Sequence, residues 1–312
     1  MSNKEEINLV DLIRVIWEGK YTISLITLAA CIIAVVYSLS LSNVYTSEAT
    51  LSPVSLEGEG SAGMSSQLGS LAGLAGVSLG ASPGGSQVTI GMEVMQSRRF
   101  FNLIASKYEV IKPLMASIDW DRNSNILIYD DDIYDVTKDK WVRAPAPPLK
   151  AEPSMQEAYR EFSSIFSISQ DNKTGIITLK IKSYSPYIAK EWLDWIILEI
   201  NNLSRNDDMA QAEKSIVYLK NEISQTNLFE IKEGISELIQ SQIEKIMLAK
   251  VTPEYLFKII DPPYVPEVKS EPSRAIICVL GFLLGLFSGI LFVLVRYFFY
   301  DANVHKTNQR SF

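Results

Sequence analysis

Two long uncharged runs limit what this chain can fold into more than any other feature of its sequence. Residues 275–295 carry no charge and lie between Arg274 and Arg296. At about 1.5 Å per residue, a helix of this length spans about 30 Å, the thickness of the bilayer hydrocarbon core. A second run, residues 21–41, directly follows Lys20; it is longer than a signal-peptide core and lacks a small-residue cleavage pattern. The sequence therefore predicts two transmembrane helices, with a buried helix of a soluble protein as the alternative for each run.

The charges around the runs predict the orientation in the membrane. Three cations lie in residues 1–20 and three more in residues 296–312, whereas residues 42–60 contain no Lys or Arg. The positive-inside rule then places both terminal segments in the cytoplasm and residues 42–274 on the far side of the membrane. Lys20, Arg274 and Arg296 are the expected membrane-flanking cations.

The residue inventory excludes several classes of active site. Residues 42–274 carry 23 Lys and Arg against 31 Asp and Glu, a negative balance that disfavours nucleic acid and anionic lipid as partners of this segment. Both cysteines, Cys31 and Cys278, lie within the apolar runs, and the single histidine is His305. A histidine-based metal site or nucleophile on the far side is therefore excluded. The sequence predicts no catalytic residues, no cofactor and no metal.

An acidic stretch at residues 129–141 raises calcium binding as an alternative. It contains Asp130, Asp131, Asp132 and Asp135. A calcium loop of the EF-hand type also needs a turn glycine and a closing glutamate, and both are missing here. The stretch is interpreted as a solvated acidic loop.

The far-side segment is predicted to mix helices and strands. The expected elements are a strand at 44–54, a Gly/Ser-rich loop at 58–86, a helix at 91–115 that ends at Pro113, an irregular segment at 116–150, a helix at 154–166, a hairpin at 166–183 and a strand at 254–261. Within the loop, residues 68–80 are apolar enough for a short helix or a membrane-surface segment. Ser154 and Glu157 have capping-box spacing at the start of their helix.

Residues 187–250 predict long helices. They contain no proline and one glycine, Gly234, and would extend about 90 Å if unbroken. Gly234 and residues 224–227 are candidate breaks, so two folded-back helices are the cautious expectation. Apolar residues recur along one face. Copies of the same chain are the expected cover for this stripe, with packing inside the subunit as the alternative.

The second apolar run contains Gly281, Gly285 and Gly289. Glycines four residues apart share one helix face and let another helix approach closely. These three residues are predicted to pack against another transmembrane helix, with glycines that serve no contact as the alternative.

A proline-rich segment, residues 261–274, precedes that run. Its prolines are Pro262, Pro263, Pro266 and Pro272. Proline fixes φ and has no backbone N–H, so the segment is predicted to be an extended, semi-rigid strut. We interpret it as a stiff coupling between two oligomerising layers; a plain spacer is the alternative.

Taken together, these features resemble the bacterial polysaccharide co-polymerases, the Wzz-type chain-length determinants. The resemblance is carried by "EEINLVDLIRVIWEGKY" (5–21), "LAGLAGVSLG" (71–80), "SRRFF" (97–101), the proline segment and the glycines of the last helix. Where the family usually has Ser-Pro-Lys before that helix, this chain has "EPSR" (271–274).

The resemblance implies an α+β fold with a membrane-proximal α/β base and protruding helices, assembled into an oligomeric bell or barrel in the bacterial inner membrane. It further implies a periplasmic main domain and a role in setting the length of O-antigen or a related glycan. The implied partners are further copies of the chain, a Wzy-type polymerase, the growing lipid-linked glycan and membrane lipid. Two other functions stay open: an adaptor subunit of a polysaccharide exporter, and a two-span sensor, for which residues 1–20 and 296–312 offer no output module.

Overall fold

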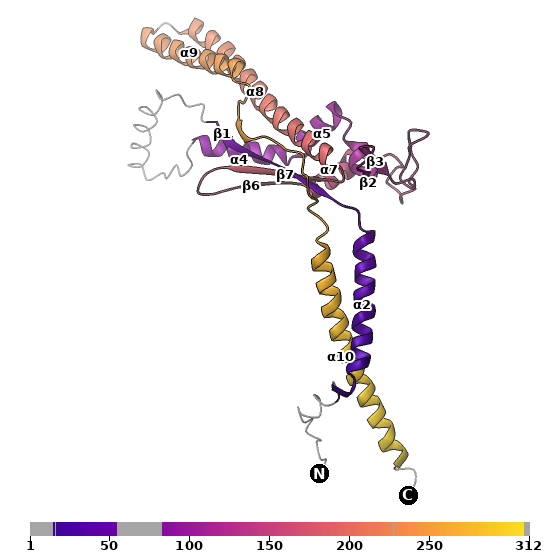
Figure 1. Ribbon diagram of the computed structural model, residues 1–312. Helices are drawn as coiled ribbons and strands as arrows, with labels where there is room; N and C mark the ends of the chain where they lie inside the picture. Colours follow the sequence, from indigo (N-terminus) through magenta and orange to yellow (C-terminus); the bar gives the residue numbers. More distant parts are fainter. Residues whose placement is uncertain (1–14, 16, 55–82, 227, 309–312) are drawn as a thin grey trace, which may run out of the picture. The chain divides into compact units, whose positions relative to one another are not determined.

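The computed structural model describes residues 15, 17–54, 83–226 and 228–308; the predictions for residues 5–14 and 68–80 lie outside these ranges. The chain divides into two compact units. The helix-pair unit is Met1–Asn43 with Ser270–Phe312, and the α/β unit is Val44–Lys269. Both helices and strands are present, which confirms the predicted α+β class (Figure 1).

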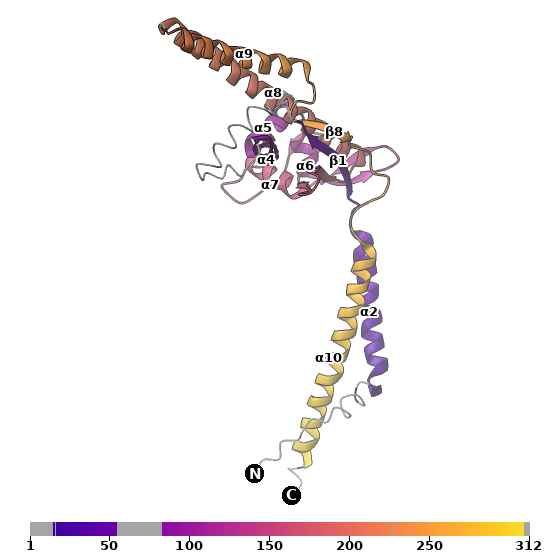
Figure 2. The same cartoon turned by 90° about the vertical axis from the view of Figure 1, so that its left-hand side faces the viewer.

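The helix-pair unit consists of α2 (Lys20–Ser40) and α10 (Arg274–Asn308), which lie side by side (Figures 1 and 2). Both helices are long and apolar enough to cross a membrane. Only 22% and 17% of their most apolar windows are buried, which is unlike the core helix of a soluble protein. The second helix continues past residue 295, where the uncharged run ends, because no proline or glycine follows to stop it.

A four-stranded antiparallel sheet forms the centre of the α/β unit. Its order is β6 (Phe166–Gln170), β7 (Ile177–Ser183), β1 (Tyr45–Pro53) and β8 (Phe257–Asp261). Alternate residues of β1 and β7 are buried, with Ala49 opposite Leu179 and Leu51 opposite Ile177. The predicted strand at 44–54 and hairpin at 166–183 are confirmed, and the predicted strand at 254–261 begins only at Phe257.

Short helices contribute to one hydrophobic core with this sheet (Figure 2). They are α4 (Pro83–Met95), α5 (Arg98–Lys107), α6 (Ile111–Ala116) and α7 (Met155–Ile165). The prediction of one helix over 91–115 is wrong. Ser97 accepts a hydrogen bond from the Phe100 N–H at 3.2 Å and starts a new helix there. Pro113 lies in the first turn of α6, where proline is tolerated, and does not end it.

Residues 116–150 are more regular than predicted. They form two small antiparallel sheets, β2 (Ser117–Asp121) with β3 (Ile126–Tyr129), and β4 (Tyr134–Asp135) with β5 (Lys140–Trp141). Asn125 and Asp139 adopt positive φ angles of 55° and 49° just before the returning strands. Asn and Asp tolerate this conformation better than most residues, so local turn chemistry pairs these strands.

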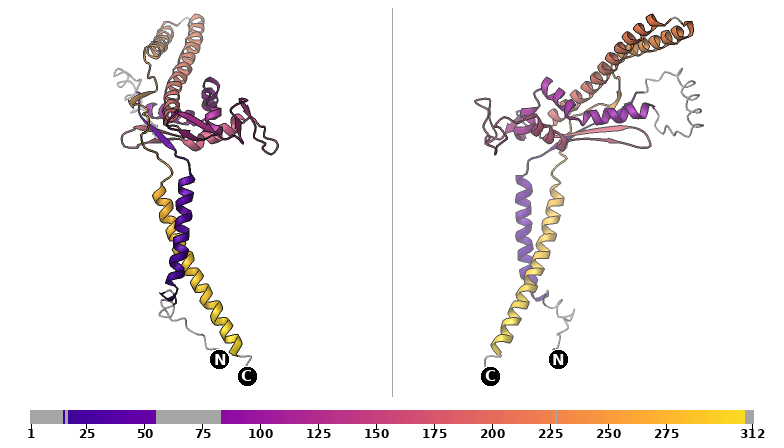
Figure 3. Two further views of the ribbon diagram at one scale, coloured as in Figure 1. Left: turned by 45° about the vertical axis from the view of Figure 1, so that its right-hand side comes forward. Right: turned by 180° about the vertical axis from the view of Figure 1, so that it is seen from behind.

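The longest helices form an arm. They are α8 (Pro186–Gln225) and α9 (Phe229–Val251), which fold back on each other (Figure 3). The first helix ends at Gln225 and the second begins at Phe229, so the break overlaps residues 224–227, one of the two predicted positions. Gly234, the other candidate, lies inside α9 and does not interrupt it. The first part of α8 packs on the sheet, and the rest pairs with α9.

Candidate functional site

The three glycines of α10 face α2 of the same chain. A Cβ atom added at Gly281 would lie 2.4 Å from the Ala34 Cβ, and one at Gly285 would lie 2.7 Å from the Ala30 Cβ. At Gly289 the nearest atom would be the Ile23 Cα at 3.2 Å. Any larger side chain would therefore push the two helices apart.

The other half of this contact lies on α2 and was not predicted from the sequence. Ala30, Ala34 and Thr27 present a small surface on α2, and the Thr27 hydroxyl donates to the Ile23 carbonyl at 2.8 Å rather than to another helix. Gly19 extends the contact, because a Cβ there would lie 2.5 Å from Val293 Cγ1. The signal was present in the small residues Thr27, Ala30 and Ala34, which are three or four residues apart and so lie on one helix face.

The pairing of α10 with α2 bears on whether the glycines indicate contact between copies of the chain. Their face is occupied by α2 of the same chain, so they supply no separate reason to expect contact between copies. The outward surfaces of α2 and α10 remain exposed and include Leu25, Ile33, Val36, Leu284 and Phe287.

The flanking cations lie at two different ends of the helix pair. Arg274 begins α10 and donates a hydrogen bond to the Asn43 side chain at 3.3 Å. Lys20 begins α2, and Arg296 lies within about one turn of that level, because Gly19 faces Val293. Both Lys20 and Arg296 are exposed.

The proline-rich segment is extended and is partly attached to the sheet. Pro263 and Pro266 are buried in the α/β unit, whereas Pro262 is exposed. The buried Ser47 hydroxyl of β1 donates to the Tyr264 carbonyl at 2.7 Å. Pro272 belongs to the helix-pair unit and is half-buried. Residues 262–266 are thus held along β1 by packing and by a hydrogen bond.

Most of the predicted arm stripe is covered inside the subunit, not left for other copies. Ile216, Leu219 and Ile223 on α8 are half-buried, as are Ile239 and Ile246 on α9. Ile235 of α9 is fully buried. The expectation that other copies cover the whole stripe is therefore wrong, because the fold-back lets the two helices cover each other.

Some apolar residues of the arm stay exposed, including Leu238 of the predicted stripe, and we call Tyr218 and Leu238 the arm patch. Tyr218 on α8 is 66% exposed and Leu238 on α9 is 54% exposed. Both line one shallow depression, together with Lys214, Ser215, Leu219 and Gln242. A surface of this kind on paired helices is suited to contact with another protein.

One buried side chain, that of Asn201, forms four hydrogen bonds and connects α8 to the segment that leads into β8. The Asn201 side chain of α8 is buried, and its Oδ1 accepts from the Leu256 and Phe257 N–H groups at 2.8 and 2.9 Å. Its Nδ2 donates to the Ile197 and Phe257 carbonyls, each at 3.1 Å. Asn201 therefore fixes the start of β8 against α8 and leaves none of its own hydrogen-bonding capacity unused.

Two further contacts involve carboxylates of α8, of which Glu199 is buried and Asp208 is half-buried. Glu199 is buried and accepts from the Lys107 Nζ at 2.5 Å and the Tyr108 hydroxyl at 2.9 Å. Asp208 accepts from the buried Tyr255 hydroxyl at 2.7 Å and pairs with Lys245 of α9 at 3.1 Å. Burial, reinforced by the Asp208 carboxylate, raises the pKa of Tyr255 well above its usual value. These groups connect α8 to α5, α9 and the segment before β8.

The carboxylates with strongly lowered pKa values, Glu157 and Asp135, bind groups of a helix cap and of a turn. Glu157 accepts from Arg143 at 2.8 Å and from the Ser154 N–H at 2.9 Å, and these bonds lower the pKa of Glu157 to about 2. The predicted capping box of Ser154 and Glu157 is confirmed. Asp135 of the acidic stretch accepts from Lys138 and Thr137, which lowers its pKa. Within the described ranges, no three His, Cys, Asp or Glu side chains come together as metal ligands would.

Comparison with known proteins gives one sequence match and several structural ones. Residues 5–107 match the family model described as Wzz, chain length determinant protein. No curated protein matches the chain significantly. A full-length bacterial polysaccharide co-polymerase is 13% identical with a TM-score of 0.40, over 95% of this chain and 99% of that one. A fragment of WzzB, a polysaccharide co-polymerase from Salmonella Typhimurium, is 12% identical with a TM-score of 0.29, over 73% and 100% of the two chains.

The sequence match covers α2, β1 and the helices through Lys107, the last residue of α5. Both TM-scores are below 0.5, so the resemblance rests on this match. The predicted resemblance of the chain to the Wzz-type chain length determinants, the bacterial polysaccharide co-polymerases, is thus confirmed, with the match lying in residues 5–107.

Proposed function

We propose that this chain regulates the length of a bacterial surface polysaccharide. It would act as an oligomeric scaffold in the inner membrane, beside a Wzy-type polymerase and its growing lipid-linked glycan. The observation that carries the proposal is the match of residues 5–107 to the chain length determinant family. The polysaccharide would be O-antigen or a related glycan, and the scaffold would perform no chemistry itself.

Three features of the chain support this function. Two helices are long and apolar enough to hold it in a membrane. The cation distribution favours cytoplasmic termini and so supports a periplasmic location for the α/β unit. The arm patch, with Tyr218 and Leu238, offers a surface for other copies of the chain.

Deletion of the gene tests the proposal directly. The expected result is a changed distribution of glycan lengths on gels, with surface polysaccharide still made. The full-length chain supplied from a plasmid should restore the original distribution. An unchanged distribution would overturn the proposal, and loss of all surface polysaccharide would instead indicate the exporter adaptor.

A further inference from the structure

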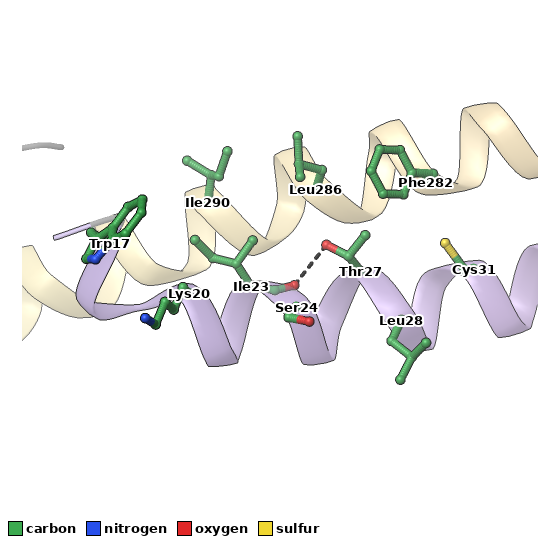
Figure 4. A pocket seen from close by; sticks show the side chains of 10 residues that line it. All are labelled: Trp17, Lys20, Ile23, Ser24, Thr27, Leu28, Cys31, Phe282, Leu286 and Ile290. Carbon is green, nitrogen blue, oxygen red and sulfur yellow. Dashed lines mark hydrogen bonds between the residues drawn. The ribbon is translucent and has the colours of Figure 1, made fainter. Parts of the chain in front are cut away.

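A groove runs along the contact between α2 and α10, inside the helix-pair unit (Figure 4). Its volume is about 510 Å³. One wall follows a face of α2 and of the turn before it, with residues three or four apart: Trp17, Lys20, Ser24, Thr27 and Cys31.

The opposite wall comes from α10 and is entirely apolar. It consists of Phe282, Leu286 and Ile290, which are four residues apart and so lie on one face. Phe282 and Leu286 are 48% and 38% exposed, so this part of the wall is open, whereas Ile290 packs against Ile23 and Val293. An alkyl chain lying between the two walls would contact carbon on both sides.

The length of the groove along α2 matches the thickness of one leaflet of a bilayer. Lys20 and Cys31 are eleven residues apart, which corresponds to about 16 Å along a helix. Half of the hydrocarbon core is about 15 Å thick. With Lys20 at the membrane surface, the groove therefore ends near the middle of the bilayer, as a single lipid tail does. A transmembrane helix of another protein would need a groove that continues through both leaflets.

The surface end of the groove is cationic and aromatic. The Lys20 ammonium lies 5.4 Å from the ring centre of Trp17 and 5.3 Å from that of Tyr21. In the part of the chain that the structure describes, Lys20 forms no ion pair with a carboxylate. Arg296 lies near the same level, and among the side chains that the structure describes at this end the two cations outnumber the exposed Glu18. Such an end complements an anionic head group.

We propose that this groove binds one anionic glycerophospholipid, with the phosphate at Lys20 and one acyl chain between α2 and α10. The lipid would come from the leaflet at the Lys20 end of the helix pair. This site does not depend on the proposed role in chain length. The preference for negative charge belongs to this end of the molecule and not to the acidic α/β unit.

Quenching of Trp17 fluorescence by brominated lipids tests the proposal. Full-length protein is placed in phosphatidylcholine vesicles that contain increasing fractions of brominated phosphatidylglycerol or brominated phosphatidylcholine. The other four tryptophans lie in the α/β unit, and a Trp17→Phe variant provides their signal for subtraction. Brominated phosphatidylglycerol should quench Trp17 at a mole fraction roughly fivefold lower than brominated phosphatidylcholine does.

Three variants distinguish a lipid bound in the groove from lipids attracted only by surface charge. Lys20→Gln removes the cation, and Ser24→Phe fills the groove while keeping Lys20; each should bring the ratio close to one. Leu25→Phe is the matched control, since Leu25 is 70% exposed and does not line the groove; it should keep the fivefold ratio.

The other outcomes contradict the proposal in distinct ways. An unchanged ratio in Ser24→Phe would show attraction by surface charge without a bound lipid. An unchanged ratio in Lys20→Gln would remove the proposed phosphate contact. Absence of quenching by both lipids would show that protein covers the groove. Displacement by an isoprenoid phosphate at lower concentrations than phosphatidylglycerol would overturn the assignment to a phospholipid.

Discussion

Gly281 of α10 faces Ala34 of α2 so closely that a Cβ on the glycine would lie 2.4 Å from the Ala34 Cβ. The two residues belong to one chain, so the contact closes a hairpin of apolar helices within the subunit. A cysteine at each position should therefore form a disulfide inside one chain. The helices need to separate by about 1.4 Å to reach the usual Cβ–Cβ distance of a disulfide, about 3.8 Å.

The crosslink is measured in a chain whose own cysteines are replaced, as Cys31→Ser and Cys278→Ser. A protease site inserted at the arm turn, near Thr226, cuts the chain between the two new cysteines. After cutting, the pieces should stay together on a non-reducing gel and separate on a reducing one. A dimer-sized band in place of the intact monomer would show that the glycines face another copy.

Asn201 should contribute strongly to the stability of the α/β unit. Asn201→Leu removes four hydrogen bonds to backbone groups and leaves the buried Leu256 and Phe257 N–H groups without a side-chain acceptor. The cost in unfolding free energy is about 2–4 kcal/mol. Thermal unfolding of the full-length protein in detergent, followed by circular dichroism, measures this loss.

The neighbouring asparagine provides the control for that experiment. Asn202 is only half-buried, and its side chain accepts from Arg205 at 2.6 Å. Asn202→Ala should cost about 0.5 kcal/mol or less. Equal losses in the two variants would mean that the contact with β8 does not explain the effect, since both substitutions replace Asn by a better helix former.

The glycine contact of α10 could be predicted from the sequence in part, whereas the hydrogen-bond partners of Asn201 could not. The four-residue spacing of Gly281, Gly285 and Gly289 predicted a close helix contact, because spacing is a local property. The identity of the partner depends on how the chain folds back, and no single helix contains that information. The partners of Asn201, Leu256 and Phe257, lie 55 and 56 residues further along the chain.

Local turn and cap residues explain two other differences between the predicted and the observed elements. The strands in residues 117–141 are too short for an alternating pattern, and they pair because Asn125 and Asp139 take up positive φ. The cap at Ser97 broke a helix that apolar spacing alone predicted to be continuous. By contrast, the long strands and the capping box of α7 were predictable, since each has a pattern contained within a few residues.

The Arg143–Glu157 pair should make stability depend on pH in the acidic range. The pKa of Glu157 is lowered to about 2, below its usual value of 4.5, by bonds from Arg143 and the Ser154 N–H. A lowered folded-state pKa adds stability above about pH 4.5, and this contribution is lost as the pH falls towards 2. Thermal unfolding between pH 6 and pH 2 should show a steeper loss for the natural chain than for Glu157→Gln.

Other carboxylates also titrate in this range, so the difference between variants is the informative quantity. Arg143→Gln removes the largest cause of the lowered Glu157 pKa and should reduce the pH dependence as well. The same slope in all three proteins would mean that the pair does not set the pH dependence.

Pro266 should affect glycan length more than it affects the amount of protein. It is buried and lies two residues after Tyr264, whose carbonyl is held by Ser47. Pro266→Ala, or Pro272→Ala nearer the membrane helix, loosens the segment, and relief of the proline restriction costs about 0.4–1 kcal/mol. The expected result is a shifted length distribution on gels at normal expression. Val268→Ala, a change at an exposed residue of the same segment, should leave the glycan length distribution unchanged. Normal glycan lengths in both proline variants would mean that the segment is a spacer.

The arm patch should control assembly. Tyr218→Ser with Leu238→Ser removes the two large exposed side chains from the depression shared by α8 and α9. Fully burying each such side chain contributes about 1.5–3 kcal/mol, so a contact between copies at this surface would weaken by several kcal/mol per interface. Light scattering of the detergent-purified protein should give a smaller particle, and the glycan length distribution should change with it. Lys220→Ser with Glu222→Ser alters two exposed charged residues of α8 and should keep the original mass. If the patch variant instead keeps its mass while the control loses it, charged contacts hold the copies together, and the apolar residues of the arm serve another partner.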